Sequence, residues 1–199
     1  MATGQLNPFI EQIKSVLEPL EKISDFQADG LRSAAVLLPF VKIADEWHVL
    51  FIHRADKGEF HRGEVAFPGG GREIGDHTLV ETAKRETWEE LGISTERIHA
   101  IGFLPPIPTI SRYWVTPIIG IIDWPTPILV NPEEVKHFFT IPYKWLADPE
   151  NWQEHELDIP ERGKVLTIDY RRYQEEHLWG ISARITNLLI ERINKRATA

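Results

Sequence analysis

Three glutamates, Glu86, Glu89 and Glu90, carry the clearest chemistry in this sequence. On an α-helix, at about 100° per residue, Glu90 lies ~40° to one side of Glu86 and Glu89 lies ~60° to the other, so all three share one stripe. Like charges at this spacing destabilise a helix by a few tenths of a kcal/mol. A hard divalent cation reverses that sign, because Mg²⁺ and Mn²⁺ prefer carboxylate and water oxygens. The stripe therefore predicts a site for Mg²⁺ or Mn²⁺.

Two neighbouring features strengthen the metal hypothesis. Arg85 directly precedes the first glutamate and can hold one carboxylate in a fixed orientation through a charge-assisted hydrogen bond. Before the helix stands Phe67-Pro68-Gly69-Gly70-Gly71, whose glycines allow the backbone to approach a ligand closely. Because a Glu-Glu pair on a helix is more often only a solvated face, the hypothesis depends on the third acid, the arginine and the glycine run together.

The helix that carries these acids is predicted over Thr78–Leu91, with Gly92 as its C-terminal stop. A second amphipathic helix is predicted within Asn7–Ile23, where Pro19 should end or kink it early. A last helix is predicted from about Ser182 to Arg196. These helices flank a series of strands and must pack on them.

Two apolar runs, Ala34–Val41 and Trp47–His53, are separated by a polar turn and predict a β-hairpin. Further strands are predicted at Glu64–Phe67, His99–Leu104, Val115–Ile122, Phe138–Ile141 and Val165–Tyr170. Strands and helices do not alternate strictly, so the pattern favours an α+β fold with a mixed central sheet between helices.

Composition narrows the class of protein. The chain of 199 residues has a formal net charge of −8, which argues against nucleic acid as a partner. It contains no cysteine, which excludes disulfides and thiol chemistry, and no apolar run of membrane-spanning length. With no pattern of a secretion signal at the start, we expect a cytoplasmic protein that does not bind membranes.

Other hydrolase classes lack their motifs. The eight histidines form no zinc-hydrolase pair with an acid at helical spacing, and His53, His61 and His77 are predicted to be ordinary polar residues rather than metal ligands. No serine stands in a Gly-x-Ser-x-Gly context, which argues against a serine hydrolase.

The segment from Gly70 to Ile93 resembles the Nudix box, the loop–helix–loop of hydrolases that act on nucleoside diphosphates linked to another moiety. The residues that match in place are Arg85, Glu86, Glu89, Glu90, Gly92 and Ile93. Two positions depart from the usual pattern. His77 stands where the first acid is usual, with Asp76 one residue earlier, and Thr87 replaces an apolar residue.

The longer spacing to Asp76 is similar to that of the coenzyme A pyrophosphatase subgroup. The upstream signature of that subgroup is matched by Arg54-Ala55, Gly63 and Phe67-Pro68-Gly69-Gly70, whereas Glu59 replaces a second arginine and Ile52 replaces a threonine. Downstream similarity is found at Gly102–Pro106, Val115–Pro117 and Leu178–Arg184. The resemblance spans about Ala34–Glu191.

The resemblance implies a Nudix-like α/β/α sandwich in residues 31–199, with residues 1–30 as a helical extension packed on it. That extension can serve its own core or a homodimer. The implied activity is metal-dependent hydrolysis of the pyrophosphate bond of coenzyme A or acyl-coenzyme A, giving 3′,5′-ADP and 4′-phosphopantetheine. The alternatives are hydrolysis of an ADP-sugar, a dinucleotide or a damaged nucleotide, and a non-catalytic Nudix domain that only binds its ligand.

The resemblance also implies roles for individual residues. Glu86, Glu89 and Glu90 would be the catalytic metal ligands. For the general base we expect Glu134, with Glu133 as its rival. Substrate binding is expected at Arg54, Arg62, Gly69 and Gly70. Asp76 is expected to brace the start of the helix rather than to touch the metal.

Overall fold

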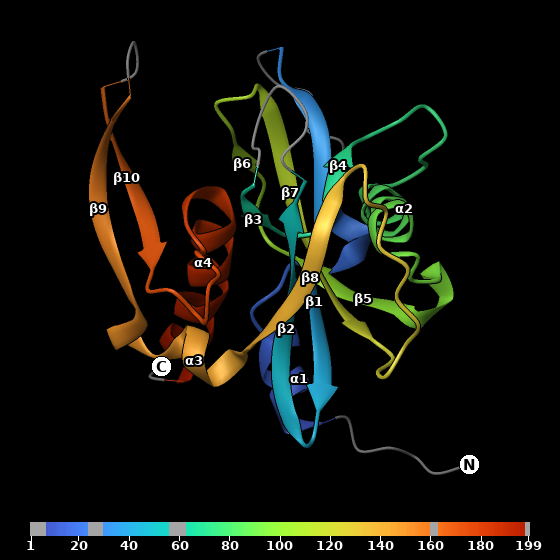
Figure 1. Cartoon of the computed structure of the whole chain (residues 1–199), viewed down its shortest axis with the longest axis horizontal. Helices are drawn as coiled ribbons and strands as arrows, with labels where there is room; N and C mark the ends of the chain where they lie inside the picture. The colour runs from blue at the N-terminus through green and yellow to red at the C-terminus, as the bar shows by residue number, and fades with distance from the viewer. Residues whose placement is uncertain (1–6, 24–29, 56–62, 160–162, 198–199) are drawn as a thin grey trace.

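A central β-sheet lies between helices on its two sides (Figure 1). The computed structural model describes residues 7–23, 30–55, 63–159 and 163–197. The strands are β1 (Arg32–Ile43), β2 (Glu46–Arg54), β3 (Val65–Ala66), β4 (Gly69–Gly71), β5 (Ile98–Phe103), β6 (Ile107–Pro108), β7 (Tyr113–Ile122), β8 (Val135–Pro142), β9 (Trp152–Ile159) and β10 (Gly163–Tyr170). The helices are α1 (Pro8–Lys14), α2 (Leu79–Leu91), α3 (Tyr143–Ala147) and α4 (Gly180–Ala197), with 3₁₀ turns at Leu20–Lys22, Thr95–Arg97 and Pro149–Asn151.

Strands β1 to β8 form one mixed sheet. Its main path runs β3-β2-β1-β7-β5, while β4, β6 and β8 pair with β1, β7 and β2 respectively. The pairing of β1 with β7 is parallel, from Arg32 opposite Tyr113 to Phe40 opposite Ile121, and the other pairings in this sheet are antiparallel. The α+β class predicted from the sequence is confirmed. Strands β9 and β10 form a separate antiparallel ribbon.

The tight turn between β1 and β2 confirms the predicted hairpin. Ala44 and Asp45 both adopt positive φ, at 44° and 66°, which is the backbone of the two-residue turns that match the twist of antiparallel strands. Lys42 and Asp45 form an ion pair of 3.0 Å across the turn. The turn sets the register in which Ile43 lies opposite Glu46.

Side chains of β1 and β2 alternate between two hydrophobic cores, as expected for strands covered on both faces. On one face Phe40 and Phe51 pack with α1 and α4 in a core that includes Ile10 and Ile13 of α1. On the other face the core residues of the same strands pack with α2 residues: Ala35, Leu37, Leu50, Ile52, Leu79, Ala83 and Leu91. The division of the chain into residues 1–30 and 31–199 stays a prediction.

The helices follow the local signals closely. Helix α2 starts one residue after the predicted Thr78 and ends at Leu91, and the N-terminal helix ends early, at Lys14, well before Pro19. Strands β4, β6 and β9 and helix α3 were not predicted. In the part of the chain that the structure describes, no helix is both long and apolar enough to span a membrane.

Candidate active site

Helix α2 is fixed at both ends and along one side. At its start the Thr78 hydroxyl accepts a hydrogen bond of 3.2 Å from the backbone N–H of Glu81, which caps the helix. At its end Gly92 takes the left-handed conformation that terminates a helix. The apolar side is buried against the sheet by Leu79, Ala83 and Leu91. These contacts fix the rotation of the helix and therefore the direction of its glutamates.

The glycine run forms strand β4, which lies against β1 and leaves no room for side chains at Gly69 and Gly70. A Cβ at Gly69 would lie 2.5 Å from the carbonyl oxygen of Ala35, and its φ of +154° also disfavours other residues. A Cβ at Gly70 would lie 2.5 Å from the carboxylate of Glu86. The absence of both side chains brings the backbone directly against the acids, and the N–H of Gly69 donates to Glu90 Oε2 at 3.0 Å.

Arg85 connects the acids of the helix with the loop before it. Its Nη1 donates to Glu86 Oε1 at 2.9 Å and to Glu89 Oε2 at 2.8 Å. Its Nη2 donates to the carbonyl oxygen of Gly71 at 3.0 Å, and the same guanidinium makes two bonds of 3.0 Å to Asp76. One arginine thus orients two of the predicted metal ligands and ties them to the glycine strand.

The polar side chains at the two positions that depart from the usual motif, Asp76 and Thr87, both have hydrogen-bond partners. Asp76 is 5% exposed and accepts further hydrogen bonds from the Glu73 N–H and the Thr82 hydroxyl, so it braces the start of the helix as expected. The hydrogen bonds from Arg85 lower the pKa of Asp76 to about 2. Thr87 is fully buried, and its hydroxyl donates to the carbonyl oxygen of Ala83 at 2.7 Å, so its polar group is satisfied at an apolar position.

Glu90 is 1% exposed, the most buried of the three glutamates. Burial raises the pKa of its carboxyl to about 8, although Arg54 and the Gly69 N–H favour the charged form. Arg54 Nη1 lies 3.8 Å from Glu90 Oε1, too far for a direct hydrogen bond. A buried carboxylate with so little compensation is costly, and a bound divalent cation would offset that cost. The surroundings of Glu90 therefore fit a metal ligand.

Glu86 and Glu89 add oxygen donors beside Glu90. Their side chains are 14% and 39% exposed, and burial raises the pKa of Glu86. Carboxylate oxygens are the donors that a hard divalent cation prefers. Arg85 lies between Glu86 and Glu89. The donor oxygens of Glu86, Glu89 and Glu90 do not all lie within 4.8 Å of one another. Among the described residues, only His53, His137 and Glu176 bring three such donor atoms that close together.

The loop before β8 brings Glu134 toward the same acids. The negative charge of Glu134 contributes to raising the pKa of both Glu86 and Glu90. Asn131 links the two segments: its backbone N–H donates to the carbonyl oxygen of Glu90 at 2.9 Å, and its side-chain amide donates to Glu134 Oε1 at 3.2 Å. The sequence carried no signal for this role of Asn131, because it depends on the position of the loop beside α2.

The remaining predicted substrate contacts divide into two groups. Arg54, Gly69 and Gly70 all lie around Glu86 and Glu90. Arg62 lies outside the residues that the structure describes.

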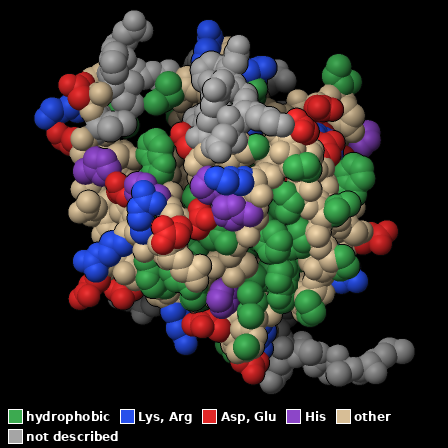
Figure 2. Space-filling model, in the orientation of Figure 1, with side chains coloured by type: hydrophobic (Ala, Val, Ile, Leu, Met, Phe, Trp, Pro, Cys, Tyr) green, Lys and Arg blue, Asp and Glu red, His purple; other side chains and the backbone are tan. Residues whose placement is uncertain are grey.

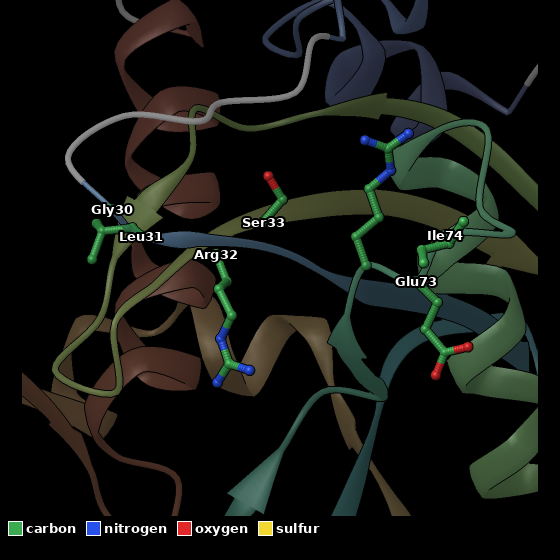
Figure 3. A pocket seen from close by; sticks show the side chains of 7 residues that line it. Gly30, Leu31, Arg32, Ser33, Glu73 and Ile74 are labelled. Atoms are coloured by element: carbon green, nitrogen blue, oxygen red, sulfur yellow. The ribbon is translucent and has the colours of Figure 1, made fainter.

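A pocket of about 670 Å³ adjoins the glycine strand and was not anticipated from the sequence. It is lined by Gly30, Leu31, Arg32 and Ser33 at the start of β1 and by Arg72, Glu73 and Ile74 in the loop after β4. Arg32 and Glu73 come from these two sides of the pocket (Figure 3). Arg32 lies 4.3 Å over the ring of Tyr113, a cation–π contact that positions its guanidinium.

The fold and the helix that carries three acids beside a glycine strand agree with the Nudix class of hydrolases. The model of the NUDIX domain matches residues 31–169, and the chain belongs to this family. Nudix hydrolases act on nucleoside diphosphate derivatives and generally use divalent metal ions.

Relatives and solved structures agree with this assignment. An uncharacterized Nudix hydrolase, NudL, from Yersinia pestis (strain Pestoides F) is 33% identical over 198 residues, which cover 98% of each chain. Among solved structures, a MutT/nudix family protein from Enterococcus faecalis gives a TM-score of 0.51 at 17% identity, covering 98% of this chain and 76% of the other. RenU, a Nudix hydrolase from M. smegmatis, gives 0.50 at 22% identity, covering 59% and 74%. At these identities the two structures support the fold alone.

Proposed function

We propose that this Nudix hydrolase cleaves the pyrophosphate bond of coenzyme A or acyl-coenzyme A, giving 3′,5′-ADP and (acyl-)4′-phosphopantetheine. The observation that carries the hydrolytic part is the set of glutamates Glu86, Glu89 and Glu90 on one helix. Arg85 orients Glu86 and Glu89, while the backbone of Gly69 and Gly70 lies against Glu90 and Glu86. We infer that these carboxylates would hold a divalent cation and that a diphosphate would approach it along the glycine strand.

The coenzyme A part of the proposal is supported by the upstream signature and by the spacing to Asp76. Ile52, which replaces a threonine of that signature, is fully buried in the core that α2 shares with the sheet. Glu59, which replaces an arginine, lies outside the described residues.

The three glutamates would hold one or more Mg²⁺ or Mn²⁺ ions. When bound, the metal neutralises charge on the diphosphate and lowers the pKa of a bound water. Arg54, which lies beside Glu90, would bind a phosphate oxygen. Gly69 and Gly70 allow the substrate to approach the backbone closely. Arg85 keeps the carboxylates of Glu86 and Glu89 in place, so that less ordering is needed when substrate binds.

Glu134 would act as the general base. Its carboxylate accepts a proton from the attacking water as the water oxygen bonds to phosphorus and the bridging P–O bond breaks. Glu134→Gln is expected to lower kcat by ~100- to 10,000-fold, the usual contribution of a positioned base. Metal affinity should stay near the parent value, which equilibrium dialysis with Mn²⁺ would measure.

The neighbouring Glu133→Gln variant is the matched control and should keep its activity. A Glu134→Gln enzyme with parental kcat, combined with a loss in Glu133→Gln, would assign the base to Glu133 instead.

The pocket beside the glycine strand supports coenzyme A over simpler diphosphates. Coenzyme A carries a 3′-phosphate in addition to its diphosphate, so its recognition calls for cations beyond the metal site. Arg32 and Arg72 line this pocket, with Glu73 as the one acidic residue among the seven that line it. One side of the pocket is lined by Arg72, the residue after Gly71. The carbonyl oxygen of Gly71 accepts a hydrogen bond from Arg85, so the pocket adjoins the candidate active site. We assign the 3′-phosphate to Arg32.

A substrate panel tests this assignment. Purified enzyme with Mg²⁺ or Mn²⁺ should hydrolyse coenzyme A faster than ADP-ribose, diadenosine polyphosphates or 8-oxo-dGTP, with products identified by mass. Arg32→Gln should raise KM for coenzyme A by about tenfold or more, since a hydrogen bond to a charged group contributes ~1.5–3 kcal/mol. KM for 3′-dephospho-coenzyme A should not change. Preference for another member of the panel would overturn the coenzyme A proposal and leave the Nudix site intact.

A further inference from the structure

A second group of metal-ligand side chains lies away from the glutamates of α2. His53 on β2 and His137 on β8 are direct partners in the strand register, and their rings stack with centroids 4.9 Å apart. Glu176, in the segment between β10 and α4, reaches both. Its Oε2 accepts a hydrogen bond of 2.9 Å from His53 Nδ1, and its Oε1 accepts one of 2.6 Å from His137 Nε2.

This cluster is on the opposite face of the sheet from α2. Phe51 and Phe139, which precede and follow the two histidines by two residues on the same strands, pack in the core that includes α4. Arg54, the next residue after His53, reaches toward Glu90 on α2 instead. On the face shown in Figure 2, histidine side chains lie beside basic side chains near the middle of the surface. The cluster therefore forms a separate site.

The three donors are held by rigid backbone. Two of them stand on paired strands. The third is in a tight turn, where Tyr173 and Glu176 exchange backbone hydrogen bonds of 3.0 Å in both directions. Strand pairing and this turn therefore bring the three donor groups together.

We propose that His53, His137 and Glu176 form a binding site for a divalent transition-metal ion of the Zn²⁺ class. Two imidazole nitrogens and one carboxylate oxygen are a donor set typical of zinc, which softer and harder cations match less well. The donor atoms already lie within 4.8 Å of one another. Zinc at ~2.0–2.2 Å from each donor in a tetrahedron needs donors ~3.4 Å apart, so small side-chain rotations suffice. The side chain of His137 is 42% exposed, which leaves a fourth position open to water.

We expect an ion bound at this site to stabilise the fold rather than to take part in catalysis. Glu176 belongs to the segment that leads into α4, whereas both histidines belong to the central sheet. A metal ion bound by all three joins that segment to the sheet and adds its binding free energy to the stability of the folded state.

The test uses the full-length protein after treatment with a chelator. Zn²⁺ is titrated in competition with a chromophoric chelator. Co²⁺ serves as a spectroscopic probe, because four-coordinate Co²⁺ in a His₂Glu site absorbs visible light more strongly than octahedral Co²⁺ in a carboxylate site. The wild-type protein should bind one Zn²⁺ tightly and melt at a higher temperature with it. Glu176→Gln and His137→Gln should each weaken Zn²⁺ binding by at least about tenfold and remove the rise in Tm.

Two variants serve as controls. His99→Gln makes the same change at an exposed histidine that pairs only with Asp123 among the contacts described, and Glu90→Gln removes an acid of α2. Both should keep the tight Zn²⁺ site. If Glu176→Gln fails to fold, the more exposed His137→Gln variant decides. Absence of tight binding in the wild-type protein would overturn the proposal, as would tight binding that survives His137→Gln and is lost in Glu90→Gln.

Discussion

Replacing Glu90 by Gln is expected to lower turnover by ~100- to 1000-fold while the fold persists. A metal-ligand carboxylate contributes several kcal/mol of transition-state stabilisation, and each 1.4 kcal/mol changes the rate tenfold. Glutamine has the same shape and can still accept the hydrogen bond from the Gly69 N–H. The change is measured as kcat with saturating Mg²⁺ or Mn²⁺, with folding checked by circular dichroism.

Although its turnover falls, the Glu90→Gln variant should be at least as stable as the parent at neutral pH. Because the pKa of Glu90 is raised from 4.5 to about 8 in the fold, the folded protein binds more protons than the unfolded chain between these values. The chelator-treated parent should therefore lose stability as the pH rises from about 4.5 to about 8. Glu90→Gln should lose less over this range and should melt at least as high at pH 7.

Glu81→Gln is the matched control for Glu90→Gln. Glu81 is on the same helix but is exposed and outside the stripe, so its replacement should leave kcat unchanged. Near-parental turnover in Glu90→Gln would remove this residue from the metal site.

Replacing Arg85 by Gln is expected to lower the free energy of unfolding by ~3–5 kcal/mol and to reduce turnover strongly. The substitution removes the cation that pairs with the buried Asp76. Removing one partner of a buried ion pair is strongly destabilising, because it leaves an uncompensated buried charge. It also releases Glu86 and Glu89 from their common donor. Chemical denaturation measures the stability, and the exposed Arg97→Gln variant controls for the loss of an arginine.

The pH dependence identifies Asp76 as the source of the stability loss. Its pKa in the fold is about 2, below the ordinary value of 3.8, so it stabilises the protein above pH 3.8 and this contribution is lost as the pH falls toward 2. The difference in stability between parent and Arg85→Gln should therefore narrow in acid. Asp76→Asn combined with Arg85→Gln should cost less than the sum of the single changes. A constant difference at every pH would contradict this account.

Local signals were sufficient to predict the helix that carries the candidate site. Its start near Thr78, its stop at Gly92 and the shared stripe of glutamates all depend on residue spacing within one helix. For Gly69 and Gly70 the sequence predicted only that their backbone approaches a ligand closely. Their contacts with Ala35 and Glu86 depend on how β4 lies against β1 and α2, which spacing does not specify.

Elements and contacts that depend on distant parts of the chain were not predictable. Strand β9 carries exposed polar residues such as Gln153 and Glu154 and forms a two-stranded ribbon, so it lacks the apolar alternation of a core strand. The cluster at Glu176 joins residues from three segments, and no motif in the sequence connects them. His53 was predicted to be an ordinary polar residue because its strand partner could not be known.

The loop between the glycine strand and α2 also offers a place for a reporter. A Cβ at Gly75 would have no heavy atom within 4 Å, in contrast to the crowded positions at Gly69 and Gly70. Since the natural chain has no cysteine, Gly75→Cys would carry a single thiol for a spin label or a fluorophore. Such a label would follow movements of this loop during turnover without any need to remove other reactive thiols.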